Sequence, residues 1–213
     1  SDAVVHDLLW TGTGGSNWNT TPSNTNWANT DLANAAAPFT TNDNVTINTP
    51  AAIIVDAGGV TAGNFTVGNS SGTVGLTGGS ITGLALTKSA AGTLSLAGTN
   101  AFSGGVFLTG GTLQTAGNAA LGSNTINING GTLQTTSGAT SISNVVSLGT
   151  AGSAFNTDAD VTFSGQFNTT GAAVNAANLV TKSGTGILTL NKTGSSALGS
   201  QMTKDTSGGA VEL

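Results

Sequence analysis

Hydrophobic positions recur along this chain as short triplets, in which one small or polar residue separates two apolar residues. Triplets of this kind lie at, for example, Val45–Ile47, Phe65–Val67, Leu94–Leu96 and Ile126–Ile128. Successive side chains of a strand point to opposite faces, so the two outer residues of each triplet share one buried face. Helical periodicity is almost absent. The pattern predicts many short strands joined by frequent turns, as in a β-sandwich or a β-solenoid.

An internal repeat distinguishes these two folds. The phrase GGTLQT starts at Gly110 and again at Gly130, 20 residues later. A repeat of about 20 residues matches one coil of a parallel β-helix, in which strands of successive coils lie roughly 4.8 Å apart and equivalent residues stack in columns. A sandwich with two similar hairpins is the alternative, because its turns come about every 8–12 residues. We predict an all-β fold, a parallel β-helix or β-solenoid.

The first 44 residues differ in composition from the rest of the chain. They contain all three Trp residues and the single His. Terminal repeats of solenoids are usually atypical, because an open end exposes unpaired backbone and apolar side chains. We therefore predict an N-terminal Trp-rich cap over residues 1–44, with a strand available for contact between subunits. Coils of about 20 residues follow over 45–209, and a C-terminal strand covers 210–213.

Charged residues make up only 6% of the chain, against about 25% in ordinary globular proteins. Between Asn44 and Asn156 the charged residues are Asp56 and Lys88. Stacked Thr, Ser and Asn side chains can replace charge on a solenoid, whereas a sandwich usually carries more charge, so this scarcity favours the solenoid. Four Lys and no Arg make nucleic acid and anionic membrane surfaces poor partners, since clustered cations bind both.

Three further features bear on the location of the protein. The chain has no Cys, so it holds neither a disulfide framework nor a thiolate metal site. No apolar run reaches the roughly 18 residues of a membrane span, so no membrane insertion is expected. The sequence begins at Ser1 rather than Met, as it would after removal of a leader. We predict a secreted protein, extracellular or at the cell surface.

The segment Gly92–Ser123 resembles the autotransporter-associated β-strand repeat. The residues that carry the resemblance are Gly92-Thr93-Leu94, Asn100, Phe102, Gly104-Gly105, Gly111-Thr112-Leu113 and Ala120-Leu121-Gly122. A degraded second copy runs from Lys182 to Ser200. The N-terminal segment is similar to the start of such repeat proteins in Trp10, Gly12, Gly14, Trp18, Asn26 and Trp27. The resemblance implies a right-handed parallel β-helix in a bacterial exported surface protein, here without the C-terminal barrel with which such passengers usually end.

Candidate catalytic groups are few. His6 and Asp7 form the one pair of neighbouring His and carboxylate residues, but a triad also needs a nucleophile within reach of the base. His6 lies in an apolar segment, and a packed or interface His is the simpler interpretation. Lyases and hydrolases built on β-helices need clustered acids or a strong cationic group. The central coils have neither, so the sequence predicts no enzyme.

Asp158 and Asp160 form a D-x-D pair that could share a Ca²⁺ ion if both lay on one strand. Only Asn156 and Thr157 supply further oxygens nearby, and a hard cation prefers six or more. The same residues are also typical of an ordinary turn leading into Val161. Asp43 receives the same interpretation, as a turn or cap residue first and a ligand second. We therefore predict no cofactor, with Ca²⁺ as the weaker alternative.

Trp10, Trp18 and Trp27 allow two interpretations. They can pack as the core of the cap, or their rings can form a platform for the pyranose faces of a glycan. Lys88 and Lys182 occupy equivalent positions in two similar phrases, LTKSAAGTLSL and VTKSGTGILTL. They are interpreted as solvated turn residues.

The two ends of a solenoid are natural sites of association, because an uncharged strand edge is a template for another chain. The candidates for self-association are Val4, Val5, Leu8, Leu9, Val211 and Leu213. Contacts between unlike ends generate fibres. The main hypothesis is a non-enzymatic secreted structural protein, a homopolymer joined head to tail in a surface filament or layer. The alternatives are the passenger stalk of an autotransporter adhesin, and a module whose Trp-rich cap binds host or matrix glycans.

Overall fold

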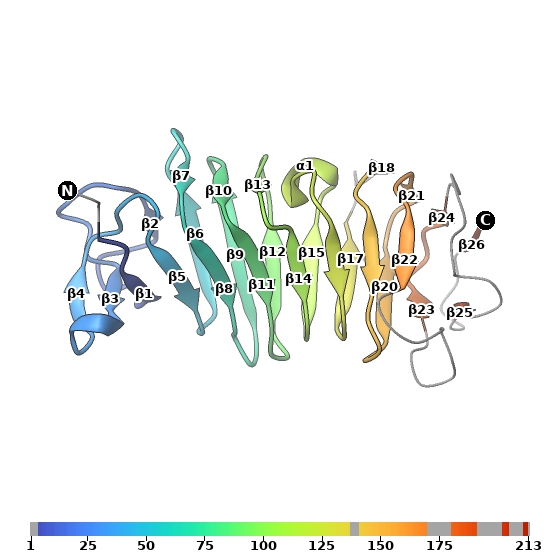
Figure 1. Cartoon of the computed structure of the whole chain (residues 1–213), viewed down its shortest axis with the longest axis horizontal. Coiled ribbons are helices and arrows are strands. Elements are labelled where there is room, and N and C mark those ends of the chain that lie inside the picture. Colours follow the sequence, from blue (N-terminus) through green and yellow to red (C-terminus); the bar gives the residue numbers. More distant parts are fainter. Residues whose placement is uncertain (1–3, 137–140, 170–179, 191–201, 205–210, 213) are drawn as a thin grey trace.

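The computed structural model describes residues 4–136, 141–169, 180–190, 202–204 and 211–212. The chain forms a parallel β-solenoid, elongated from the N-terminal end to the C-terminal end (Figure 1). Strands predominate and helix is scarce, because the triplets are too short for helices and most are followed by Gly or Asn within two residues. The predicted all-β parallel β-helix is confirmed, and the β-sandwich is excluded.

Three faces of the coil form four sheets. In sheet A the parallel strands are β1 (Asp7–Trp10), β5 (Asn44–Ile47), β8 (Asn64–Val67), β11 (Ala85–Lys88), β14 (Val106–Leu108), β16 (Ile126–Ile128), β19 (Val146–Leu148) and β22 (Phe167–Thr169). Sheet B comprises β2 (Asn17–Trp18), β6 (Ala51–Val55), β9 (Thr73–Gly78), β12 (Thr93–Leu96), β15 (Thr112–Thr115), β17 (Thr132–Thr135), β20 (Ser153–Thr157), β23 (Val180–Ser183) and β25 (Met202–Lys204). The third face carries sheet C, with β7 (Val60–Thr61), β10 (Ile81–Gly83) and β13 (Ala101–Phe102), and sheet D, with β18 (Ser141–Ile142), β21 (Val161–Phe163), β24 (Leu188–Leu190) and β26 (Val211–Glu212).

The repeated phrase GGTLQT stacks on itself. Strands β15 and β17 pair in parallel, with Leu113 opposite Leu133 and Gln114 opposite Gln134. The Leu side chains are buried, and on the outer face Gln114 Nε2 donates to Gln134 Oε1 at 3.4 Å. The phrase therefore repeats because each copy occupies the same place in successive coils, as the sequence predicted.

The third face is interrupted by the short helix α1 (Asn118–Leu121), which lies in the coil between those of β13 and β18. Ala120 and Leu121 are buried and fill the core at this level. Asn100 ties the helix to earlier coils, because its Nδ2 donates to the Ala120 carbonyl at 2.9 Å and its Oδ1 accepts from Ile81 N at 2.9 Å. The Ala-Leu-Gly element of the repeat thus forms a helical turn.

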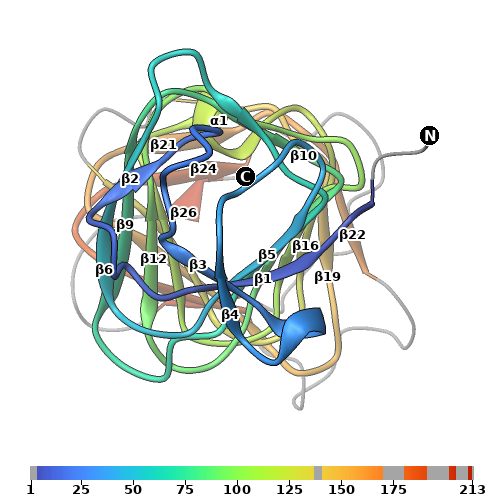
Figure 2. The ribbon, with the colours of Figure 1, turned by 90° about the vertical axis from the view of Figure 1, so that its left-hand side faces the viewer.

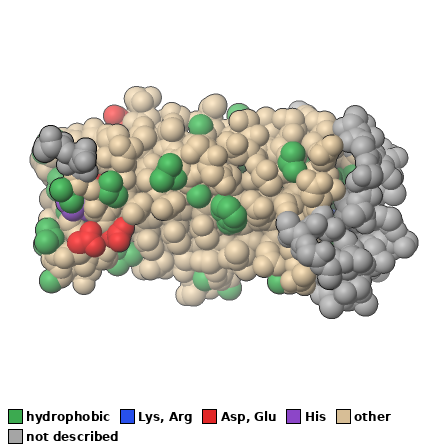
Figure 3. Space-filling model, viewed as in Figure 1, with side chains coloured by type: hydrophobic (Ala, Val, Ile, Leu, Met, Phe, Trp, Pro, Cys, Tyr) green, Lys and Arg blue, Asp and Glu red, His purple; other side chains and the backbone are tan. Residues whose placement is uncertain are grey.

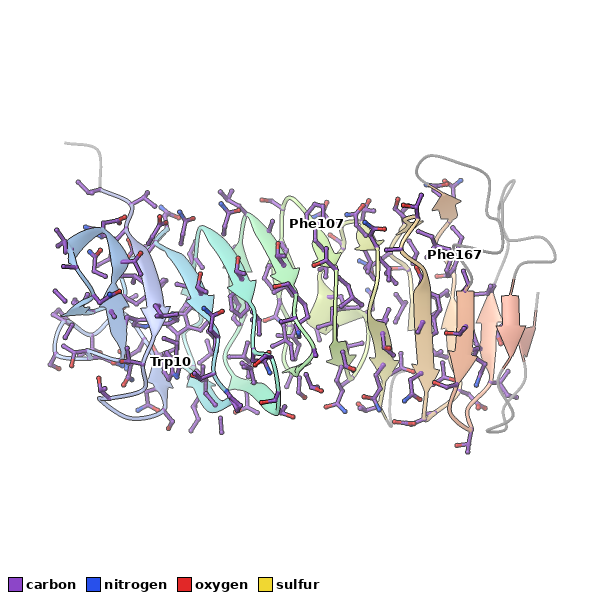
Figure 4. The ribbon with its side chains drawn as sticks, turned by 90° about the horizontal axis from the view of Figure 1, so that it is seen from below. Trp10, Phe107 and Phe167 are labelled. Carbon is purple, nitrogen blue, oxygen red and sulfur yellow. The ribbon has the colours of Figure 1, made fainter. Side chains whose placement is uncertain are left out.

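A second aromatic cluster fills the core farther along the solenoid. Phe155 of β20, Phe163 of β21 and Phe167 of β22 come from three different faces, and their ring centroids lie 5.5–6.1 Å apart. Figure 4 labels Phe167 within this part of the stack. All three side chains are buried. One large ring from each face closes the interior here, whereas in earlier coils Phe65 and Phe102 are buried mainly among Val, Leu and Ile.

The N-terminal cap adds antiparallel strands to sheet A. Strand β3 (Trp27–Asn29) pairs antiparallel with β1, and β4 (Ala35–Ala37) pairs antiparallel with β3. The 3₁₀ helix η1 (Thr30–Leu32) lies between them, and the strands cross the end of the coil (Figure 2). Strands β1 and β2 pair in parallel with β5 and β6. The predicted cap, residues 1–44, therefore already contains the first strands of sheets A and B.

Candidate functional site

The three Trp residues form the core of the cap. Trp10, Trp18 and Trp27 are 5%, 0% and 1% exposed. Trp27 meets the other two indoles edge to face, with centroids 4.9 Å from Trp10 and 5.2 Å from Trp18. Phe39 and Phe65 pack edge to face on Trp18 at 5.4 and 5.5 Å. No broad ring face is left for a sugar to stack on, so the structure supports the first interpretation, the core of the cap, and contradicts glycan contact at these three residues.

The prediction of an N-terminal strand for self-association is wrong for Leu8 and Leu9, which lie in β1. Both edges of β1 are paired within the chain, with β3 on one side and β5 on the other, and Leu8 is buried. Leu9 is partly exposed, whereas Val4 and Val5 are 71% and 50% exposed. The segment 7–10 is thus an internal strand of sheet A. At the other end Val211 begins β26, and Leu213 lies outside the described residues.

His6 pairs with Asp43 rather than with its neighbour Asp7. The two side chains approach with Nδ1 3.2 Å from Oδ1, and His6 N donates to the same oxygen at 2.9 Å. Asp43 is buried, and its Oδ2 accepts from both N and Oγ1 of Thr40 at 2.8 Å. The carboxylate lies between His6 and the Thr40 hydroxyl, so the imidazole cannot take the hydroxyl proton as a triad requires. Asp43 instead ties the N-terminal segment to the turn before β5.

Asp158 and Asp160 each hold together adjacent coils. Gln134 Nε2 donates to Asp158 Oδ2 at 2.8 Å, which extends the Gln114–Gln134 ladder by one more rung. Ile187 N donates to Asp160 Oδ1 at 2.8 Å. The two residues follow β20 in a bend and are exposed, rather than lying side by side on one strand. Within the described ranges, no three His, Cys, Asp or Glu residues gather in a way that could hold a metal ion.

The two lysines of the similar phrases are buried, which corrects their interpretation as solvated turn residues. Lys88 and Lys182 are both 0% exposed. Lys88 Nζ donates to the carbonyl oxygens of Ser89 and, at 2.9 Å, Ala90. Lys182 Nζ donates to those of Ser183 at 3.0 Å and Gly184 at 2.7 Å. Each ammonium group therefore binds the backbone of the turn that follows it.

The two lysine turns lie at different corners of the coil. Lys88 ends β11 and precedes the turn from sheet A to sheet B, whereas Lys182 lies in β23 and precedes the turn from sheet B to sheet D. The two phrases are therefore similar because both form a turn whose carbonyl oxygens bind a lysine, and not because they occupy equivalent places in the coil. Strand alternation was the signal for their burial, because Lys88 falls on the same face as Leu86, and Lys182 on the same face as Val180.

Stability should depend on pH through Lys88. Burial lowers the pKa of Lys88 below its ordinary value of 10.5. Between that lowered pKa and 10.5, the unfolded chain binds more protons than the folded chain, so the free energy of unfolding rises with pH in this interval. Below the lowered pKa both states carry the proton, and the buried charge is a constant cost. We expect urea titrations at increasing alkaline pH to show this rise.

The matched variant for this measurement is Lys88→Met, which keeps the length of the side chain without a titrating group. Its free energy of unfolding should rise less over the same pH interval. The chain has no Cys and no Tyr, so its lysines are the side chains that titrate there. Equal pH slopes for the two proteins would show that Lys88 has the same pKa folded and unfolded.

A groove of about 660 Å³ follows the corner between the third face and sheet A. It is lined by Val5, Asn42, Asn44, Thr61, Ala62, Gly63, Asn64, Thr82, Gly83, Leu84, Ala101, Ser103 and Asn124. None of these side chains titrates, so the groove has neither a general acid nor a general base. The face in Figure 3 shows acidic side chains near the N-terminal end and uncharged atoms over most of the rest. This groove thus offers hydrogen-bonding groups and a few apolar side chains.

A search against family models, curated proteins and solved structures found no match to this chain. Among the described residues, no helix has the length and apolar character needed to cross a membrane. The resemblance to the autotransporter-associated repeat therefore stays a prediction from the sequence motifs. The fold gives those motifs a structural reason: Asn100 joins three coils, through Ile81, its own Ala97 and Ala120, and Phe102 is buried.

Proposed function

We propose that this chain is a non-enzymatic structural protein of the cell exterior. In this proposal it is a bacterial β-solenoid subunit that joins further copies end to end in a surface filament or layer. The resemblance of Gly92–Ser123 to the autotransporter-associated repeat supports the exported location. The proposal assigns the protein no cofactor and no chemical reaction.

The observation that carries the proposal is an elongated solenoid with almost uncharged flanks. Of the two charged residues between Asn44 and Asn156, Lys88 is buried, so Asp56 alone brings charge to the surface of these coils. Surfaces with little charge of either sign favour association. Along the length of a solenoid, the backbone N–H and C=O groups of each strand are hydrogen-bonded to the coils on either side. Strands with unpaired backbone groups occur at its two ends. The ends are therefore the places where backbone pairing can add another copy.

Electron microscopy of negatively stained native protein, together with sedimentation over a concentration series, tests this proposal. We expect rods of constant width whose length increases with concentration. The control is Ala101→Lys, which places a charge on an exposed strand residue of the flank and should leave rod length unchanged. Loss of rods in this variant would assign assembly to lateral contacts. Particles that stay monomeric at the highest concentration would contradict end-to-end association.

A further inference from the structure

Sheet A ends on an unpaired strand at the N-terminal end of the molecule. Strand β4 is the last strand of the sheet, and within the described chain only β3 pairs with it. Its three residues, Ala35, Ala36 and Ala37, are exposed or partly exposed. Figures 1 and 2 place β4 across the terminal face of the solenoid. The outer backbone groups of β4 are therefore directed away from the coils, along the direction in which another strand could be added.

Strand β4 is only three residues long, which itself limits pairing at a sheet edge, but it lacks the other features by which soluble proteins protect such edges. Charged residues, bulges and Pro within an edge strand prevent pairing between molecules. No charged residue lies between Leu32 and Asn42, and Pro38 comes after the strand. Leu32, in the adjacent η1, is 62% exposed, and Ala33 next to it is also exposed. Strand β4 itself is thus uncharged, and Leu32 and Ala33 beside it are apolar, which favours addition of an extended strand. The nearest carboxylate, Asp31 of η1, accepts a hydrogen bond from Asp7 N.

We propose that β4 pairs antiparallel with β4 of a second copy across a two-fold axis. This inference rests on the proposed end-to-end association and names its partner at the N-terminal end. In this arrangement Ala36 faces Ala36 of the other copy, and Ala35 faces Ala37, so all three residues are paired in both chains. Sheet A then runs continuously from one solenoid into the other, head to head. The contact is self-complementary and closes on itself, unlike a head-to-tail contact, so a filament also needs a second contact, between the C-terminal ends of two copies.

The N-terminal end of a second copy is a better partner for this edge than the C-terminal end of a second copy. A head-to-tail joint that continued the coil would need open strands on three faces. At the N-terminal end only sheet A extends beyond the first coil, since sheet B begins at β2 and sheet C at β7. A single projecting edge can pair with its own copy without the other faces. Three strand residues with Leu32 are far fewer than the roughly 20–30 residues a side of a stable interface, so this joint is weak and depends on concentration.

Disulfide trapping tests the geometry, because the chain contains no Cys of its own. Opposite residues of an antiparallel pair have Cα atoms about 4.5–5.5 Å apart, within the 4.4–6.8 Å or so that a disulfide spans. Under mild oxidation at high protein concentration, Ala36→Cys should convert largely to a covalent dimer. Ala101→Cys, an exposed Ala in β13 on the flank, should remain monomeric.

The register provides a second, independent test. Ala35→Cys alone should not form a dimer, because position 35 faces position 37 of the other copy, but a mixture of Ala35→Cys and Ala37→Cys should. Rods that form without the Ala36→Cys dimer would overturn the head-to-head pairing and leave end-to-end association intact. A trapped Ala36→Cys dimer without rods in the native protein would keep the pairing and contradict the filament. Equal trapping at Ala36 and Ala101 would mean random collision and would overturn the pairing.

Discussion

Replacing Trp18 with alanine is expected to lower the free energy of unfolding by about 3–5 kcal/mol, the range for a buried large aromatic residue. Trp18 is completely buried, and its ring meets Trp27, Phe39 and Phe65 edge to face at 5.2–5.5 Å. Each such pair adds about 0.5–1.5 kcal/mol beyond the burial of area. The loss should also loosen β2, because Trp18 is one of its two residues. Urea denaturation followed by far-UV circular dichroism measures the change.

The matched control is Phe107→Ala. Phe107 is also aromatic and lies on a strand, but its side chain is 37% exposed on the outer side of β14 and is labelled in Figure 4. Its removal should change stability by no more than about 0.5 kcal/mol, as for ordinary surface substitutions. A Trp18→Ala protein as stable as Phe107→Ala would show that the aromatic cluster does not hold the cap on the coils.

The substitution Gly111→Ala is expected to lower the free energy of unfolding by roughly 2–6 kcal/mol, from backbone strain and overpacking together. Gly111 has a φ of 65°, in the left-handed region. A Cβ atom there would overlap the carbonyl oxygens of Ala90 and Gly92 and would lie 2.8 Å from Lys88 Nζ. The Gly therefore allows one coil to close over the lysine turn of the coil before it. Thermal and urea unfolding both measure the loss.

Gly75→Ala is the control for this prediction. Gly75 lies in β9, and a Cβ atom added to it would meet no other atom within 4 Å. Alanine at a compatible position stabilises a protein by about 0.4–1 kcal/mol, because it restricts the unfolded chain. The two Gly→Ala variants should therefore differ in sign. Similar losses at both positions would mean that glycine is needed for strand flexibility rather than for the close approach at Gly111.

Short-range patterns were sufficient to predict the coil. Alternation in triplets such as Ile126–Ile128 determines which residues face inward, and the spacing of Gly110 and Gly130 fixes the length of one turn. Both signals hold in a parallel solenoid because each strand pairs with one about 20 residues away along the chain. The position of the cap followed from composition alone. The fold was therefore predictable to the level of coil and cap.

The contacts of polar residues were not predictable in the same way. Asp43 binds a partner 37 positions earlier in the chain, His6, and no local pattern specifies that distance. Lys88 was misread because a charged residue is rarely fully buried without an opposite charge, whereas here backbone carbonyl oxygens receive the ammonium protons. The antiparallel strand β4 was also missed, since three Ala residues carry no alternation of apolar and polar positions.

The interrupted third face has a mechanical consequence. In a parallel solenoid the hydrogen bonds between strands run along the long axis, so tension applied to the ends is shared by the ladders at each level. Sheets A and B continue past α1, but β13 and β18 belong to separate sheets. Two ladders instead of three resist stretching at that level. A rod built from these coils is therefore expected to yield at the level of α1 or at the first coil, where sheets A and B alone carry strands.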